Sequence, residues 1–300
     1  MDFTTNFISL PVYFTRLLPC SRGLLLLEPP LDKALLINTF LITIGAFSLL
    51  WLVHLVLVDA GIVDLYWGPG FAIIGGLVFF NNAGASTAQL ILQAFTLVWS
   101  LRLAAHIFWR HRHSKQEDPR YAAMRAKTGA TFWWKSLIKI FLLQALLMWL
   151  IATPQHIGLA PAKGELEGGA LLIYASGCLA YSIGLLFESL ADWQLMRFRA
   201  RTRMKEKTCQ EGLWALSRHP NYFGEILLWW GLGLMAFAIS ASVFAFIGPA
   251  LLTFLIIKVS GVGLLEQHLV RTRPDYQNYI KTTRCLIPLP LLPWRGKDKT

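Results

Sequence analysis

Long apolar stretches follow one another along most of the chain. Residues 34–58 contain no formally charged side chain, and this stretch is longer than the roughly 20 residues that a helix needs to cross a bilayer. The second stretch fits the pattern of a membrane span least well, because Asp64 and the Gly68-Pro69-Gly70 break interrupt it. The pattern predicts an all-α, polytopic membrane helix bundle of about seven transmembrane helices, at residues 34–58, 62–80, 88–109, 137–157, 170–187, 223–240 and 243–265.

These helices divide the chain into three parts. Residues 1–33 are predicted as an extracytoplasmic or interfacial segment, in which 7–27 lie along the membrane interface or against the bundle. No secretory signal is legible there, because no basic region precedes an apolar run. Residues 34–265 form the predicted membrane domain, and 266–300 a basic cytoplasmic tail.

Composition agrees with a membrane protein, and the charge then sets the topology. Of the chain, 55% is hydrophobic and 15% charged, with a net charge of +11. That charge is typical of a nucleic-acid binder or of a cytosolic membrane face. Of the 28 Lys and Arg residues, 21 fall in 110–136, 197–218 and 271–299, whereas the opposite loops contain only Lys163. The positive-inside rule therefore predicts an external N-terminus and a cytoplasmic C-terminus, without nucleic acid.

Five charges lie inside the predicted spans: Asp64, Arg102, Lys139, Glu225 and Lys258. All fall in the cytoplasmic half of their span. A charge deep in a bilayer costs about 2–3 kcal/mol unless it is paired or hydrated. Lys139 is expected to extend to the interface. Asp64 and Arg102 form either a structural ion pair or part of a water-accessible cavity that opens to the cytosol.

Two stretches carry candidate chemistry. In the first, residues 187–199, helical spacing places Glu188, Asp192 and Arg199 near one face. This is either a solvated helix end or a binding surface. The second stretch, residues 212–225, places Pro220 at the first position of a helix.

A helix start of this kind attracts anions, because its N–H groups are free. Arg218, His219, Asn221 and Tyr222 surround it with further donors. The sequence favours an anion-binding site here. The alternative is a helix cap whose arginine and histidine face lipid headgroups.

These stretches resemble a known family. GLWALSRHPNYFGEILLWWG at 212–231, with FESLADWQLMRFR at 187–199 and VDLYWGPGF at 63–71, is similar to steroid 5-alpha-reductase-like membrane proteins, and most of all to their bacterial branch of unknown function. The resemblance implies a seven-helix reductase. Such a protein binds NADPH from the cytosol and reduces an activated carbon–carbon double bond in a lipid, such as a steroid-like or isoprenoid-like enone.

The resemblance also assigns roles. Eukaryotic members hold the steroid ketone with a Gln-Glu pair near the first spans, and the first three spans of this chain contain none. Asp64 and Tyr66 are the nearest donors and become the candidate catalytic residues. No metal site is expected. The candidate cofactor-binding residues are Glu188, Asp192, Arg199, Arg218, His219, Asn221, Tyr222, Glu225 and His268.

Other readings stay open. Isoprenylcysteine carboxyl methyltransferases resemble the RHPNYFGE block too, and they use S-adenosylmethionine. A transporter or a non-enzymatic membrane protein is a further alternative. The expected partners are the bilayer and a hydrophobic small molecule. The expected location is the inner or plasma membrane of a bacterium, or the endoplasmic reticulum of a eukaryote.

Overall fold

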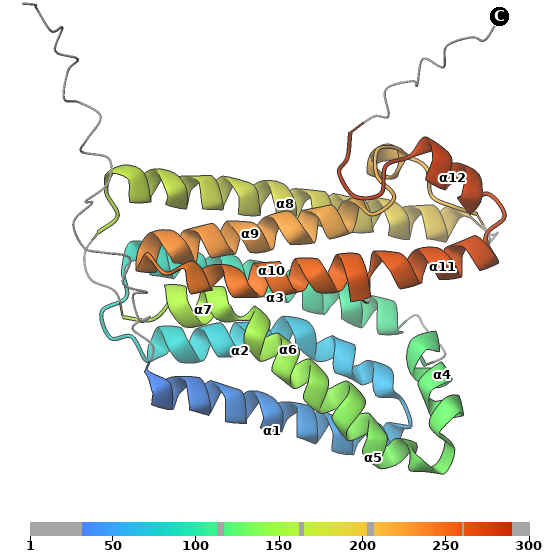
Figure 1. Ribbon diagram of the computed structural model, residues 1–300, viewed down its shortest axis with the longest axis horizontal. Coiled ribbons are helices and arrows are strands. Elements are labelled where there is room, and N and C mark those ends of the chain that lie inside the picture. Colours follow the sequence, from blue (N-terminus) through green and yellow to red (C-terminus); the bar gives the residue numbers. More distant parts are fainter. Residues whose placement is uncertain (1–31, 113–116, 162–164, 203–206, 260, 290–300) are drawn as a thin grey trace, which may run out of the picture.

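A computed structural model describes residues 32–112, 117–161, 165–202, 207–259 and 261–289 (Figure 1). Within these residues the regular structure is helical and contains no strand. The helices are α1 (Lys33–Leu57), η1 (Ala60–Tyr66), α2 (Trp67–Phe80), α3 (Thr87–Arg112), α4 (Pro119–Thr128), η2 (Gly129–Thr131), α5 (Phe132–Ser136), η3 (Leu137–Leu142), α6 (Leu143–Ile151), α7 (Thr153–Gly158), α8 (Gly168–Arg201), η4 (Gly212–Ala215), α9 (Pro220–Ser240), η5 (Val243–Phe246), α10 (Ile247–Phe254), η6 (Leu255–Val259), α11 (Val262–Thr272) and α12 (Tyr276–Thr282).

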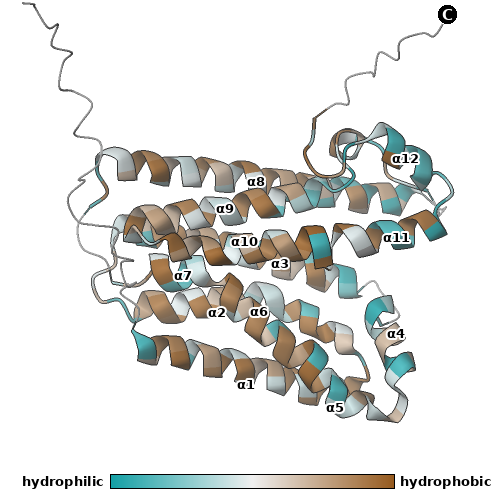
Figure 2. Cartoon of the chain, viewed as in Figure 1, coloured by the Kyte–Doolittle hydropathy of each residue, from teal (hydrophilic) through white to brown (hydrophobic). Residues whose placement is uncertain are grey.

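Six helices in the described part are long and apolar enough to cross a membrane, and a seventh apolar helix, Val243–Val259, is shorter. Figure 2 shows hydrophobic residues along all of them. The prediction of an all-α polytopic membrane bundle is confirmed. The last span, expected at 243–265, stops early because the chain bends at Gly261, where a side chain would collide with the Ile256 carbonyl. The chain then continues as α11.

Two other boundaries differ from expectation. The Gly68-Pro69-Gly70 sequence does not break the second span, because it lies in the first turn of α2, where a proline is tolerated. The region 110–136, expected as a loop, contains α4. The Asp118 carboxylate caps α4 by accepting a hydrogen bond from the Arg120 N–H at 2.9 Å.

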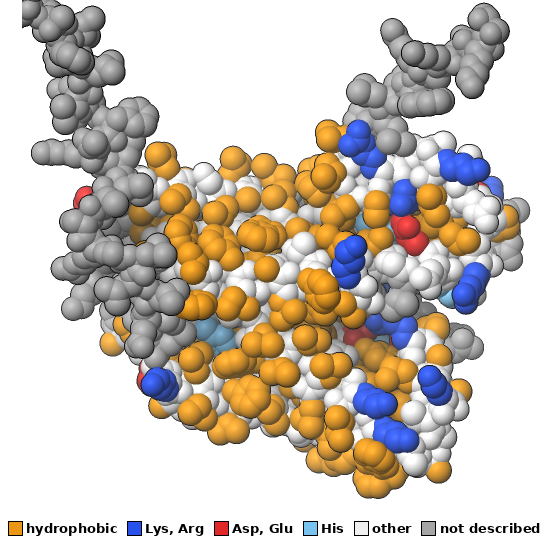
Figure 3. Space-filling model, viewed as in Figure 1, with side chains coloured by type: hydrophobic (Ala, Val, Ile, Leu, Met, Phe, Trp, Pro, Cys, Tyr) orange, Lys and Arg blue, Asp and Glu red, His pale blue; other side chains and the backbone are white. Residues whose placement is uncertain are grey.

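The two ends of the bundle differ in charge. In Figure 1, α4, α11 and α12 lie at the same end, and most Lys and Arg side chains on the visible face of Figure 3 gather there. We call this the basic end. The residues from 266 to 289, expected as part of a tail, contain most of α11 and the whole of α12, which pack at this end of the bundle. The predicted N-terminal segment, up to residue 31, lies outside the described residues.

Glycines bring α8 and α9 unusually close. A side chain on Gly184 would collide with the backbone of Gly224, and the reverse also holds; Gly177 and Gly231 form a second such pair two turns away. Small residues let helix backbones approach within a membrane. This contact fixes Glu188 and Asp192 of α8 against the first turns of α9.

Candidate functional site

Arg102 is the centre of a buried polar cluster between α3 and α8. Its guanidinium forms ion pairs with Glu188 and Asp192 and also donates to the Glu188 carbonyl at 3.1 Å. The indole N–H of Trp99 donates to the second Glu188 oxygen at 3.1 Å. Both carboxylates are less than 10% exposed. A single guanidinium therefore pairs with two acids within a largely apolar bundle.

The first turn of α9 joins this cluster. The Asn221 side chain donates to Asp192 at 3.2 Å, and Nε2 of His106 lies 3.6 Å from the same carboxylate. The structure thus brings together Glu188, Asp192 and Asn221, which the sequence proposed as cofactor-binding residues. His106 was not among the candidates. Its position one turn from Arg102 on α3 is the signal that would have indicated it.

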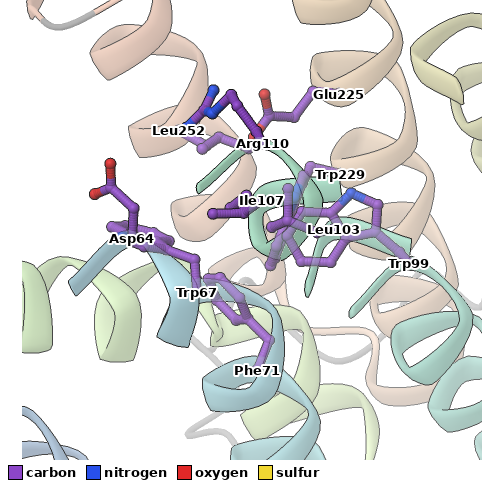
Figure 4. A pocket seen from close by; sticks show the side chains of 10 residues that line it. All are labelled: Asp64, Trp67, Phe71, Trp99, Leu103, Ile107, Arg110, Glu225, Trp229 and Leu252. Atoms are coloured by element: carbon purple, nitrogen blue, oxygen red, sulfur yellow. The ribbon is translucent and has the colours of Figure 1, made fainter. Parts of the chain in front are cut away.

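An aromatic cavity of about 150 Å³ lies next to the cluster (Figure 4). Phe71, Trp99 and Trp229 form its inner wall, with ring centroids 4.8–5.5 Å apart and steeply inclined rings. Glu225 and Arg110 also line it, and the side chain of neither forms a hydrogen bond or ion pair within the described part of the chain. The full lining is Asp64, Trp67, Phe71, Trp99, Leu103, Ile107, Arg110, Glu225, Trp229 and Leu252.

Asp64 does not pair with Arg102, so of the two alternatives for these charges the structural ion pair is wrong. Its carboxylate instead pairs with Arg120 at 3.0 Å and accepts a hydrogen bond from the Tyr121 hydroxyl at 2.8 Å. Both partners belong to α4, within the region expected as a loop. Arg102 faces α8, whereas Asp64 contacts α4 directly. Asp64 therefore lines the cavity, but its carboxylate is already paired, and this contact holds α4 against η1.

A second ion pair holds α4 at its start. Glu117 pairs with Arg125 at 2.8 Å and accepts a hydrogen bond from the Ala60 N–H at 2.8 Å. Burial alone would raise the pKa of Glu117, but the Arg125 and Ala60 hydrogen bonds outweigh it and lower the pKa. The carboxylate is therefore ionised at neutral pH.

Tyr66, the other candidate catalytic residue, is not among the residues that line the cavity. Its ring packs edge-on against Phe47 of α1, with the centroids 5.3 Å apart. The structure therefore places Tyr66 between α1 and α2, where it contributes to packing.

Arg218 and His219 already bind an anion, and that anion belongs to the chain itself. Glu266 of α11 accepts from Nε of Arg218 at 2.7 Å, and Nε2 of His219 lies 3.0 Å from the same oxygen. Arg218 also donates to the carbonyls of Ile280 and Thr283. Anion binding at the start of α9 was predicted, but the sequence did not indicate that residue 266 supplies the carboxylate.

The remaining candidates lie around these two clusters. The Tyr222 ring stacks on His219, with centroids 5.4 Å apart and an interplanar angle of 11°. Arg199 and His268 are exposed. Arg199 lies on α8 beyond Asp192, toward the basic end. The structure does not bring His268 to the Arg102 cluster.

One group near the start of α9 has the residue types of a metal site. His219, Glu266 and Cys285 each place a potential ligand atom within 4.8 Å of the others. The Arg218 guanidinium shares the same carboxylate, however, and its positive charge opposes a metal ion there. We interpret the group as an ion-paired contact between α9 and α11.

Glu266 should stabilise the fold in a pH-dependent manner. Burial raises its pKa, but hydrogen bonds from His219 and Arg218 outweigh that effect and lower it from 4.5 to about 2. A carboxyl group whose pKa is lower in the folded than in the unfolded state stabilises the fold at pH values above its unfolded-state pKa. This stabilisation is lost as the pH falls through the folded-state pKa. We expect Glu266→Gln to cost about 2 kcal/mol at neutral pH. The difference from wild type should shrink between pH 4.5 and about 2.

Thermal unfolding at a series of pH values measures this. Glu211→Gln is the matched control, because Glu211 pairs with Arg201 while both side chains are more than half exposed. Its effect should stay within about 1 kcal/mol at every pH. A Glu266→Gln difference that does not depend on pH would contradict the ion-pair interpretation.

The fold and these clusters define an integral, multi-pass membrane protein with a polar site next to an aromatic cavity at the basic end of its bundle. The model of a family described as a protein of unknown function, DUF1295, matches residues 50–283. The chain belongs to this family. No curated protein and no solved structure matches it significantly.

Proposed function

We propose that this protein is a membrane-embedded reductase, which binds NADPH at the basic end of the bundle and reduces an activated carbon–carbon double bond in a lipid. The observation that carries the proposal is the cluster of Glu188, Asp192 and Asn221 around Arg102, beside an aromatic cavity. The sequence resemblance to steroid 5-alpha-reductase-like proteins supports it, because Asp192 and Asn221 match the cofactor-contacting pattern of that family, although Glu188 stands where its eukaryotic members carry an asparagine.

The residues fit such a cofactor. Its phosphates need cations, and the guanidinium groups of Arg110 and Arg199 form no hydrogen bond or ion pair with other described residues. Its ribose hydroxyls and carboxamide need hydrogen-bonding groups, which Asp192, Asn221 and Glu225 offer. A cavity of about 150 Å³ is of the size that holds one six-membered ring. Arg218 is less available than the sequence indicated, because Glu266 holds it.

When bound, the cofactor supplies a hydride. The protein's own groups have three tasks. Arg110 and Arg199 bind phosphate, Glu225 orients the carboxamide, and the Phe71 and Trp229 rings exclude water from the reacting carbons. Excluding water strengthens each of these polar contacts. Asp64 remains the candidate that holds or donates a proton to the substrate, at the price of loosening its contact with Arg120.

The proposed substrate is a hydrophobic small molecule. The inner wall of the cavity is aromatic, and the described helices around it are apolar on their outer faces. A lipid dissolved in the bilayer is apolar enough to pack against this aromatic wall and to approach along the apolar outer faces. A bacterial inner or plasma membrane, or the endoplasmic reticulum of a eukaryote, is the proposed location.

Ligand-dependent thermal stability tests the proposal. A ligand at 100 times its dissociation constant stabilises the folded state by about 2.7 kcal/mol. We expect saturating NADPH to raise the melting temperature of the detergent-purified protein by about 5–10 °C. NADH should stabilise less, because it lacks the 2′-phosphate that Arg110 and Arg199 would bind. Stabilisation by S-adenosylmethionine alone would overturn the reductase and favour a methyltransferase.

The variant Asn221→Ala is the internal check on this experiment. Loss of one hydrogen bond should weaken NADPH binding by up to about tenfold, because such a bond contributes about 0.5–1.5 kcal/mol. Its melting temperature without ligand should fall by only a few degrees, because the Asn221 hydrogen bond to Asp192 is lost as well. Unaltered NADPH binding in this variant would mean that the cofactor does not contact the start of α9.

A further inference from the structure

A groove of about 400 Å³ lies between α1 and α2, at the end of the bundle opposite the basic end (Figure 1). It is separate from the cluster and the aromatic cavity of the proposed site. Asn38 and Ile42 of α1 line one side, and Leu77 of α2 and Asn81, which follows α2, line the other. The volume is within the range of sites that bind small molecules. We call it the α1–α2 groove.

The lining of the groove changes from polar to apolar along the helix axes. Asn38 lies in the second turn of α1, and Asn81 lies directly after the last residue of α2, so the two amides are near the same end of the bundle. Ile42 and Leu77 each lie one helix turn further into the bundle, which is a distance of about 6 Å. The groove therefore has an amide-lined mouth and an aliphatic inner part.

This order matches the layers of a bilayer. α1 has 25 residues and is therefore about 37 Å long, whereas the hydrocarbon layer is about 30 Å thick. If α1 is centred in the bilayer, it projects about 4 Å beyond the hydrocarbon at each end, and Asn38 lies about 4 Å inside the boundary. The glycerol esters of a phospholipid lie at this boundary, because they join its headgroup to its acyl chains.

The two amide side chains lack a partner within the described part of the chain. Asn38 and Asn81 are both exposed, and neither side chain forms a hydrogen bond with another described residue. The Thr39 hydroxyl, also in the lining, is by contrast engaged: it donates to the Leu36 carbonyl at 2.9 Å and accepts from Trp149 at 3.2 Å. At the edge of the hydrocarbon an unpaired amide is costly, because little water is present to bind it. The two asparagines therefore need hydrogen-bond acceptors from outside the described residues.

The surroundings of the groove are apolar and open to the bilayer. Leu41 and Phe80, which also line it, are 58% and 85% exposed, so the aliphatic lining continues onto the outer surface of the bundle. α1 is also the least buried of the six candidate spans in the described part of the chain. Of its most apolar stretch 17% is buried, against 22–44% in the other five. A molecule seated between α1 and α2 would therefore add substantially to the contacts of α1.

We propose that the α1–α2 groove binds one phospholipid from the leaflet opposite the basic end. The ester carbonyls of the lipid accept hydrogen bonds from the Asn38 and Asn81 amides, and one acyl chain packs along Ile42 and Leu77. No charged side chain is among the described residues that line the groove. The site therefore recognises the ester linkage rather than the charge of the headgroup, and the bound lipid stabilises the contact between α1 and α2.

Two matched lipids test this recognition. Ester-linked and ether-linked phosphatidylcholines of equal chain length differ in the ester carbonyls alone. We expect the ester-linked lipid to bind the delipidated, detergent-purified protein up to about tenfold more tightly for each hydrogen bond that the ether lipid cannot form. The lipid concentration that gives half of the maximal rise in melting temperature measures the affinity. Equal affinities of the two lipids would overturn the proposal.

Two variants locate the site. Asn38→Leu removes an amide at similar side-chain size, so the preference for the ester-linked lipid should shrink up to about tenfold. Ile42→Trp fills the inner part of the groove, and native mass spectrometry should show that it loses the one phospholipid that the wild-type protein retains. Val53→Trp is the matched control, because Val53 is 41% exposed on the same helix, close to the 44% of Ile42, and does not line the groove.

An unchanged preference in Asn38→Leu, or equal lipid retention by Ile42→Trp and Val53→Trp, would overturn the proposal. A wild-type protein that retains no phospholipid would do the same, and would favour another occupant, such as the segment of the chain that precedes α1. None of these measurements involves NADPH, so failure of the lipid site and failure of the proposed reductase are distinguishable.

Discussion

Replacing Arg102 with glutamine should produce the largest loss of stability of any single charge change at the site. The variant leaves Glu188 and Asp192, both less than 10% exposed, without their shared cation. Removing one partner of a buried ion pair typically costs about 3–5 kcal/mol, since the remaining charge stays desolvated. We expect the melting temperature to fall by about 10 °C, and NADPH to stabilise the variant weakly or not at all.

Matched variants separate charge from packing. In the triple variant Arg102→Gln, Glu188→Gln and Asp192→Asn, no buried charge is left unpaired at this cluster, so most of the lost stability should return. Arg120→Gln is the control for a cation at the edge of the site. The Arg120 side chain is 54% exposed, and exposed pairs contribute about 0–1 kcal/mol. If the melting temperature of Arg102→Gln fell by less than 2 °C, Arg102 would not be needed to stabilise the two buried carboxyl groups.

The spans could be predicted from the sequence because transmembrane hydropathy is a local property. The apolar run at 34–58 corresponds to Lys33–Leu57. The acidic and basic residues after 187 were expected to continue the fifth span, and α8 does extend to Arg201. The break at Gly261 could not be read from hydropathy, because it depends on how the glycine backbone packs against Ile256.

The partners within the site depend on helix rotation, which one sequence does not reveal. Asp64 and Arg102 both lie in the cytoplasmic half of their spans, and the sequence left open whether they form an ion pair or belong to a water-accessible cavity. The structure turns Arg102 toward α8 and supplies Arg120 from α4 to Asp64. In the same way the anion at Arg218 comes from Glu266, which is 48 residues further along the chain. Residues within one helix turn, such as Glu188 and Asp192, were grouped correctly because their spacing alone places them together.

A single methyl group on Gly184 should disrupt the protein as strongly as the loss of Arg102. A Cβ there would lie 2.5 Å from the Leu228 nitrogen and 2.6 Å from the Gly224 oxygen. Both are backbone atoms within a helix, so they cannot move aside without shifting α9. We expect Gly184→Ala to cost more than about 4 kcal/mol, the range in which overpacking and backbone displacement abolish a native fold. The fraction of monodisperse protein after detergent extraction, and its melting temperature, measure this.

Gly45→Ala is the control, because a Cβ on Gly45 of α1 meets no atom within 4 Å. Alanine in an exposed helix position should stabilise by up to about 1 kcal/mol relative to glycine. The Gly184→Ala result also bears on the site, because the α8–α9 distance sets how Asn221 reaches Asp192. If the variant folds with an unchanged melting temperature but loses its response to NADPH, close approach of the helices serves the site rather than the fold. If stability and NADPH binding both stay at wild-type values, the glycine contact between α8 and α9 determines neither the fold nor the position of Asn221 at the cluster around Arg102.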